Sequence, residues 1–160
     1  MAASASSLSI KTALGSITLA FRPDAAPMTC DYIAKCAASG LYNGTTFYRS
    51  DFVIQCGLYG SEKQNPFGDL QVNETKSGAK ISNVRGTAAI AHFDVPDNGN
   101  TEFFINLQSS PHLDDVYGGY CVFAEVAASD QASWATVDAI ADAIANKGQQ
   151  VVRIENMTVA

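Results

Sequence analysis

The sequence is poor in basic residues and has no cluster of them. Its 10 Lys and Arg stand against 16 Asp and Glu, which gives a formal net charge of −6 at pH 7. A protein that neutralises a run of phosphates needs grouped Lys and Arg, so binding to nucleic acid or to an anionic membrane surface is not expected. No stretch approaches the about 18 consecutive apolar residues of a membrane span, and no spanning helix is predicted.

The residues that commonly bind metals or act as nucleophiles are also scarce. Four cysteines lie among apolar neighbours and form neither a C-x-x-C pair nor the spacing of a zinc site: Cys30, Cys36, Cys56 and Cys121. We therefore expect buried, reduced thiols rather than disulfides. The two histidines, His92 and His112, have no H-E-x-x-H spacing, and no G-x-S-x-G sequence marks a hydrolase nucleophile. No metal, cofactor or hydrolytic triad is predicted.

The length and the first residues indicate one domain in a reducing compartment. A chain of 160 residues can bury about 70% of the surface that its unfolded form exposes. The opening "MAASASSLSI" lacks the basic start and apolar core of a secretory signal, and it lacks the Arg residues of a mitochondrial transit peptide. We expect a single domain over residues 1–160, monomeric and cytoplasmic, in which residues 1–7 form a disordered extension.

Alternation of apolar and polar residues dominates the chain and predicts strands. Residues 8–21 are predicted to form a β-hairpin that turns near Gly15, and residues 45–57 are predicted to form one longer, largely buried strand. Further strands are predicted within residues 86–93, 101–108, 119–126 and 149–160. A loop rich in Asp, Pro, Asn and Gly, "DVPDNGN", separates two of them.

Two segments have the periodicity of helices. Residues 24–40 carry an early proline, end at Gly40 and place their apolar residues on one face. Residues 132–145 form a second apolar stripe, for which Ser133 or Asp130 is the expected N-cap. Many short strands with two isolated helices predict a mainly β fold, an antiparallel barrel or sandwich with helices at its ends.

A single Arg lies inside the apolar stretch "GTTFYRSDFVIQCG". Arg49 could lay its methylenes on apolar surface and keep its charge in water. It could equally be the polar group of a site whose walls are the aromatic residues around it. Each of those aromatics, taken alone, is more typical of a core than of a site, so the pattern leaves both interpretations open.

The order of the motifs resembles the cyclophilins, the peptidyl-prolyl cis/trans isomerases. "LYNGTTFYRSDFVIQCG", "RGTAAIAHF", "TEFFINLQSSPHLD" and "GYCVFAEV" are similar to four segments of that family in the right order, over nearly the whole chain. The long loop from Ala91 to Phe103 and the last of these segments resemble the bacterial-type branch. The resemblance implies a closed eight-stranded antiparallel β-barrel with two capping α-helices. It also implies isomerase activity on X-Pro bonds in peptides and flexible protein segments, and no cofactor.

The resemblance also assigns a site. It places the catalytic Arg at Arg49 and a Tyr typical of bacterial-type members at Tyr120. The remaining positions that it implies for substrate binding are Phe52, Val53, Gln55, Ala91, His92, Glu102, Phe104, His112 and Leu113. The apolar members of this set would hold the proline ring, and Gln55 together with the backbone near His92 would fix the peptide.

Four departures from the family pattern are visible. Tyr48 replaces a His beside the Arg, and "RSDF" is two residues shorter than the usual spacing, which keeps Arg49 and Phe52 facing as before only if the segment stays extended. Glu102 replaces a Gln and could form a charge-assisted bond with Arg49. Such a bond would either hold the guanidinium in place or withhold it from substrate, so a non-catalytic module that binds proline-containing partners is the alternative. His112 replaces the Trp that contacts cyclosporin, which predicts weak cyclosporin binding.

Overall fold

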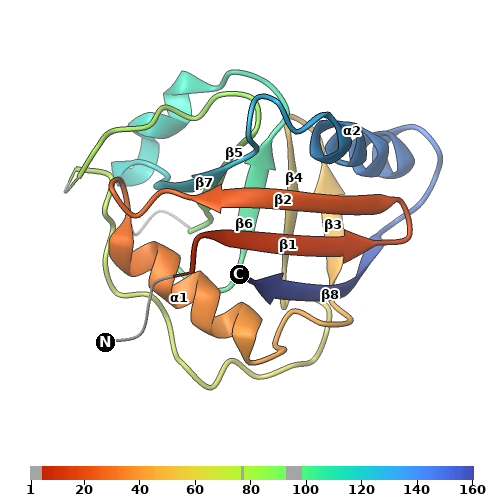
Figure 1. Ribbon diagram of the computed structural model, residues 1–160, viewed down its shortest axis with the longest axis horizontal. Coiled ribbons are helices and arrows are strands. Elements are labelled where there is room, and N and C mark those ends of the chain that lie inside the picture. Colours follow the sequence, from red (N-terminus) through yellow and green to blue (C-terminus); the bar gives the residue numbers. More distant parts are fainter. Residues whose placement is uncertain (1–4, 77, 93–98) are drawn as a thin grey trace.

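The computed structural model describes residues 5–76, 78–92 and 99–160, and it has the form of a β-barrel flanked by helices (Figure 1). The strands are β1 (Ser7–Thr12), β2 (Gly15–Phe21), β3 (Thr46–Ser50), β4 (Val53–Gly57), β5 (Thr87–Ile90), β6 (Phe103–Asn106), β7 (Val122–Glu125) and β8 (Val152–Val159). The helices are α1 (Pro27–Ala38) and α2 (Gln131–Ala145), with the short 3₁₀ turns η1 (Pro111–Asp114) and η2 (Val116–Gly118).

The eight strands form a closed antiparallel barrel in the order β1-β2-β7-β5-β6-β4-β3-β8. The ring closes where β1 pairs with β8, with Ser9 opposite Thr158. Alternate residues of each strand point inward, as the alternation in the sequence predicts, and their side chains fill the barrel. Phe103 and Phe123 meet edge to face in this core, with ring centroids 5.6 Å apart. The expected fold class is therefore confirmed.

Both helices begin where local signals place them. Pro27 opens α1, and Gly40 follows its last turn with a φ of +80°, a conformation that glycine adopts without strain. Asp130 caps α2 by accepting a hydrogen bond from the Ser133 amide at 3.1 Å, so Asp130 rather than Ser133 is the N-cap. The helix α1 packs on β7 and β8 and α2 mainly on β2 and β3, and Figure 1 shows them on opposite sides of the barrel.

The prediction of one long strand over residues 45–57 is wrong. The segment forms a tight hairpin instead, because β3 and β4 are antiparallel neighbours with Ser50 opposite Ile54. Asp51 makes the turn: its Oδ1 accepts a hydrogen bond from the Val53 amide at 3.2 Å, and its own amide donates to the Val53 carbonyl at 3.0 Å. An Asp can close a turn through its side chain without the Gly or Pro that usually marks one.

The expected extension over residues 1–7 is too long. Residues 1–4 lie outside the described part, but Ser6 donates its amide proton to the Ala160 carbonyl at 2.7 Å and Ser7 begins β1. The predicted strand 86–93 and the loop "DVPDNGN" also run into residues 93–98, which are not described.

The cysteines are free thiols and all are buried, as predicted. Burial raises the pKa of Cys36 and of Cys121 to about 11. Within the described ranges, no group of three His, Cys, Asp or Glu side chains could hold a metal ion. None of the described helices is long and apolar enough to cross a bilayer.

Candidate functional site

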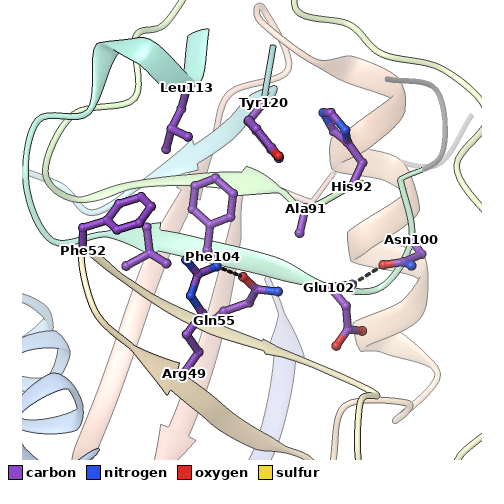
Figure 2. A pocket seen from close by; sticks show the side chains of 11 residues that line it. Arg49, Phe52, Gln55, Ala91, His92, Asn100, Glu102, Phe104, Leu113 and Tyr120 are labelled. Atoms are coloured by element: carbon purple, nitrogen blue, oxygen red, sulfur yellow. Dashed lines mark hydrogen bonds between the residues drawn. The ribbon is translucent and has the colours of Figure 1, made fainter. Parts of the chain in front are cut away.

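A pocket of about 310 Å³ opens on the outer face of the barrel beside the β3–β4 turn (Figure 2). Its lining residues are Arg49, Phe52, Val53, Gln55, Ala91, His92, Asn100, Glu102, Phe104, Leu113 and Tyr120. Every site residue predicted from the sequence except His112 is among them. The structure thus brings together residues of β3, β4, β6 and η1 and residues that flank β5, β6 and β7.

The floor of the pocket is apolar because of the alternation in β4 and β6. Ile54 and Cys56 point into the barrel core, so Val53 and Gln55 point outward, and Gln55 pairs with Phe104 across the two strands. The outward apolar residues form a second, smaller cluster: Val53, Ala89, Phe104, Leu113 and Val122. This cluster is a dry surface of the size and chemistry that suit a small apolar ring.

The Arg49 guanidinium lies at the mouth of the pocket, above this floor (Figure 2). Its Nε donates to Asp51 Oδ2 at 2.8 Å and its Nη1 donates to Gln55 Oε1 at 3.0 Å. Its Cζ lies 5.3 Å from the centroid of the Phe52 ring. No acceptor in the described ranges bonds to Nη2, so this nitrogen still has protons to donate to a ligand. The side chain is 41% exposed, which leaves it accessible from solvent.

Glu102 does not pair with Arg49, so the charge-assisted bond that the sequence left open does not form. Its carboxylate is occupied by four donors: the Tyr48 hydroxyl at 2.9 Å, the Leu58 amide at 2.9 Å, the Tyr59 amide at 3.1 Å and the Thr101 hydroxyl at 2.8 Å. The actual ionic partner of Arg49 is Asp51, which the hairpin turn places beside it. The predicted single strand over residues 45–57 gave no reason to expect Asp51 beside Arg49, because it contained no turn.

Tyr120 and His92 form the wall opposite Arg49. Their rings stack with centroids 4.3 Å apart, and the Tyr120 ring meets Phe104 edge to face at 5.7 Å. A His92 ring nitrogen lies 2.8 Å from the Gly119 carbonyl, which fixes the imidazole. Burial raises the pKa of Tyr120, so the phenol stays neutral. This wall is therefore rigid, uncharged on its Tyr120 side and largely aromatic.

Asn100 is a pocket residue that sequence reasoning missed. Its Oδ1 accepts a hydrogen bond from the Glu102 amide at 2.9 Å, and its side chain lies at the rim in Figure 2. It ends the polar loop after Ala91, where several Asn and Asp residues alternate without any pattern that would single one out. His112 lies outside the pocket, exposed, with its ring centroid 6.1 Å from that of Phe52.

The arrangement suits binding and polarisation better than covalent chemistry. The cysteine thiols lie in the core rather than in the pocket, and the described lining residues include no Ser or Thr beside a base. What the pocket offers is an apolar floor, a permanently protonated guanidinium above it and an amide side chain next to that guanidinium. Such a site can hold an apolar ring and donate a hydrogen bond to an atom of that ring.

Comparisons with known proteins agree with this geometry. The family model of the cyclophilin type peptidyl-prolyl cis-trans isomerases matches residues 7–159. The chain is 32% identical over 128 residues to the peptidyl-prolyl cis-trans isomerase CYP23 of Arabidopsis thaliana, a match that covers 76% of this chain and 55% of that protein. It is 36% identical over 120 residues to peptidyl-prolyl cis-trans isomerase B of Escherichia coli, covering 70% of this chain and 72% of that protein.

A solved structure shares the fold. It is that of a cyclophilin type peptidyl-prolyl cis-trans isomerase of Cryptosporidium parvum in the presence of the dipeptide Ala-Pro, with a TM-score of 0.78 at 21% identity over 96% of this chain and 98% of that one. The family-model match extends from the first strand of the barrel to the last, and the residues that the family resemblance points to, apart from His112, meet in one pocket. The chain belongs to the cyclophilin-type peptidyl-prolyl cis-trans isomerase family.

Proposed function

We propose that the protein is a peptidyl-prolyl cis/trans isomerase and that Arg49 is its catalytic residue. The observation that carries the proposal is the position of the Arg49 guanidinium, which stands over an apolar floor with Nη2 left to donate. The names of the sequence relatives support the same activity. The substrates are X-Pro bonds in peptides and in flexible or unfolded protein segments.

The reaction is a rotation and needs neither a nucleophile nor a metal. The peptide bond resists rotation with a barrier of about 18–20 kcal/mol because C–N resonance is lost in the twisted state. Uncatalysed X-Pro exchange takes tens to hundreds of seconds as a result. Shortening this time to about a millisecond requires an acceleration of roughly 10⁵-fold, or about 7 kcal/mol of transition-state stabilisation.

A donor aimed at the prolyl nitrogen supplies part of this stabilisation. In the twisted state that nitrogen loses conjugation and its lone pair becomes localised, so a hydrogen bond from Arg49 binds the transition state better than either ground state. A guanidinium suits this task because it is always protonated and holds its N–H groups in a rigid plane. The apolar floor below it lowers the local dielectric and strengthens the contact.

The rest of the pocket would immobilise the substrate. Phe52, Val53, Phe104 and Leu113 would hold the proline ring while the acyl side of the bond turns. The Gln55 side chain and the backbone at residues 91–92 would bind the peptide by hydrogen bonds. Because the proline side of the X-Pro bond is held in place, binding energy lowers the barrier to rotation of the acyl side.

An isomerase assay on the purified chain tests the proposal. In a protease-coupled assay with an X-Pro peptide, wild type should accelerate exchange, and Arg49→Ala should lose roughly 100-fold or more in kcat/KM, the loss typical of a removed transition-state donor. Far-UV circular dichroism should not change. Arg85→Ala is the matched control, because Arg85 has the same side-chain exposure of 41%, pairs with Asp138, lies over the Trp134 ring and is not among the lining residues of the pocket. Unaltered turnover in Arg49→Ala would contradict the role of Arg49.

The alternative is a module that holds proline-containing partners without catalysis. The Arg49–Asp51 ion pair favours it, because a guanidinium engaged by a carboxylate polarises a ligand less strongly. Saturable peptide binding with no acceleration by wild type would support this alternative.

We further propose a bacterial-type cyclophilin that acts in the cytoplasm on folding chains. Tyr120 and the long loop after Ala91 support the branch.

A further inference from the structure

The guanidinium of Arg49 is the end of a row of hydrogen bonds. Arg49 Nη1 donates to Gln55 Oε1 at 3.0 Å, and Gln55 Nε2 donates to the Tyr48 hydroxyl at 3.0 Å. The Tyr48 hydroxyl in turn donates to Glu102 Oε1 at 2.9 Å. We propose that Tyr48 is a positioning residue for Arg49, and that it acts by holding the Gln55 amide in the orientation that accepts from the guanidinium. This inference rests on the proposed isomerase function.

A β-bulge explains why two consecutive residues of β3 reach the same amide. The pairing between β3 and β4 runs from Phe47 opposite Cys56 to Arg49 opposite Gln55, so Tyr48 and Arg49 together face Gln55. In a regular strand, neighbouring side chains point to opposite faces of the sheet. A bulge of two residues against one re-aims a side chain, and bulges are frequent beside active sites. The extra residue therefore allows Tyr48 to contact Gln55 next to Arg49.

The chemistry of the two ends gives the row a single direction. A guanidinium can only donate and an ionised carboxylate can only accept. Since Tyr48 has one proton and gives it to Glu102, its oxygen must accept from Gln55, and only the amide nitrogen of Gln55 can donate. The amide oxygen is then left for Arg49. A Gln55 amide turned over would place its NH₂ group against the guanidinium, and both contacts would be lost.

Glu102 anchors the row because its position is fixed from several sides. Besides Tyr48, it accepts from the backbone amides of Leu58 and Tyr59 and from the Thr101 hydroxyl. A carboxylate has about four acceptor sites, so these donors saturate it. Glu102 is accordingly a support for Tyr48 rather than a group that binds substrate.

Tyr48 keeps its proton under ordinary conditions. Burial of the half-buried phenol and the negative charge of Glu102 both raise the pKa of Tyr48 above its usual value. The hydroxyl therefore donates to Glu102 throughout the neutral range. The hydrogen bond from Tyr48 to Glu102 is therefore removed by replacing Tyr48 with a residue that lacks the hydroxyl, whereas a change of pH near 7 leaves it in place.

Steady-state kinetics on an X-Pro peptide test the role of Tyr48. Tyr48→Phe should lower kcat roughly 10-fold while KM changes by less than about twofold, because the guanidinium is misplaced but the apolar floor is intact. Gln55→Ala should lower kcat at least as much, and the double variant should be no slower than Gln55→Ala, since residues acting in one row are not additive. Tyr59→Phe is the matched control. Tyr59 is 72% exposed, and its ring centroid lies 5.1 Å from that of Tyr48. Its hydrogen bond to Glu102 comes from its backbone amide, which the substitution keeps.

Nuclear magnetic resonance separates this inference from the proposed function. Tyr48→Phe should shift the side-chain amide signals of Gln55 and the guanidinium signals of Arg49, and Tyr59→Phe should leave both in place. Full activity of Tyr48→Phe beside an active wild type, strictly additive losses, or unshifted signals would each overturn the inference while leaving the isomerase function standing. A wild type without acceleration would overturn the function instead, and the spectra would still decide whether Tyr48 orients Gln55 and Arg49.

Discussion

Asp51 binds Arg49 and shapes the turn that carries it. One carboxylate oxygen lies 2.8 Å from Arg49 Nε, and the other accepts the Val53 amide. The same side chain therefore closes the β3–β4 hairpin and restrains the guanidinium at the mouth of the pocket. The short turn between Arg49 and Val53 thus also contains Asp51, the ionic partner of Arg49.

Asp51→Ala should slow isomerisation and destabilise the fold only slightly. We expect kcat/KM to fall roughly 3- to 10-fold as Arg49 gains freedom. The free energy of unfolding should fall by only about 1 kcal/mol, because exposed ion pairs contribute little. Peptide kinetics and urea unfolding measure the two effects. Asp138→Ala, which breaks the comparably exposed pair with Arg85, is the control and should not slow the reaction. Equal rates for Asp51→Ala and wild type would exclude the restraint.

Gly57→Ala should disturb the Glu102 anchor. A Cβ at Gly57 would overlap the Glu102 carboxylate, which would have to move. We expect a loss of roughly 1–3 kcal/mol in the free energy of unfolding, as for other overpacked sites, together with a fall in kcat. Gly60→Ala is the control, since Gly60 also has a positive φ but no atom within 4 Å of a new Cβ. A Gly57→Ala variant as stable and active as Gly60→Ala would show that Glu102 moves freely.

Asp114 should make stability depend on pH in the acid range. Burial alone would raise the pKa of Asp114, but hydrogen bonds from Ser82 and Asn83 outweigh it and hold the pKa below its usual value. The stabilisation is then complete above the unfolded pKa of about 3.8 and is lost as the pH falls through the lower, folded value. Asp114→Asn should therefore be less stable than wild type near neutral pH, and the gap should narrow in acid.

Urea unfolding at a series of pH values measures that gap. Asp115→Asn, at the exposed neighbouring position, serves as control. A gap of constant size from neutral pH into strong acid would show that the charge of Asp114 does not contribute.

Cyclosporin should bind weakly, in the micromolar range or above. His112 occupies the position where the family resemblance expects a Trp, and its exposed imidazole offers less apolar surface beside Phe52 than an indole would. His112→Trp should tighten binding, as measured by inhibition of the isomerase or by calorimetry. Nanomolar inhibition of wild type would contradict this expectation.

Local signals predicted the elements well because each depends on a few neighbouring residues. The hairpin near Gly15, the helix opened by Pro27 and the cap at Asp130 all follow from backbone geometry and capping that operate over one turn. Alternation could not distinguish a barrel from a sandwich, because both bury one face of each strand. The closure of the barrel and the composition of the pocket came from the family resemblance.

Side-chain partners could not be predicted from the sequence. Glu102 and Arg49 have opposite charges and could have paired, but backbone amides and Tyr48 bind the carboxylate, while a turn without Gly or Pro places Asp51 beside Arg49. The bulge at Tyr48 likewise has no signature in the residue types. Pairings of this kind depend on turns and registers, which are set by the whole sheet rather than by any short pattern.

The order of strands in the barrel also bears on how the chain reaches its native state. The first strand pairs with the last, and β8 lies between β1 and β3, so the ring cannot close until residues 152–159 are available. Contacts so distant along the chain form slowly because a large loop must close before they do. During synthesis, β3, which carries Arg49, would pair with β4 on one edge, while its other edge would stay unpaired until β8 had been made. A protein proposed to speed the folding of others could itself close its barrel only once residues 152–159 had been synthesised.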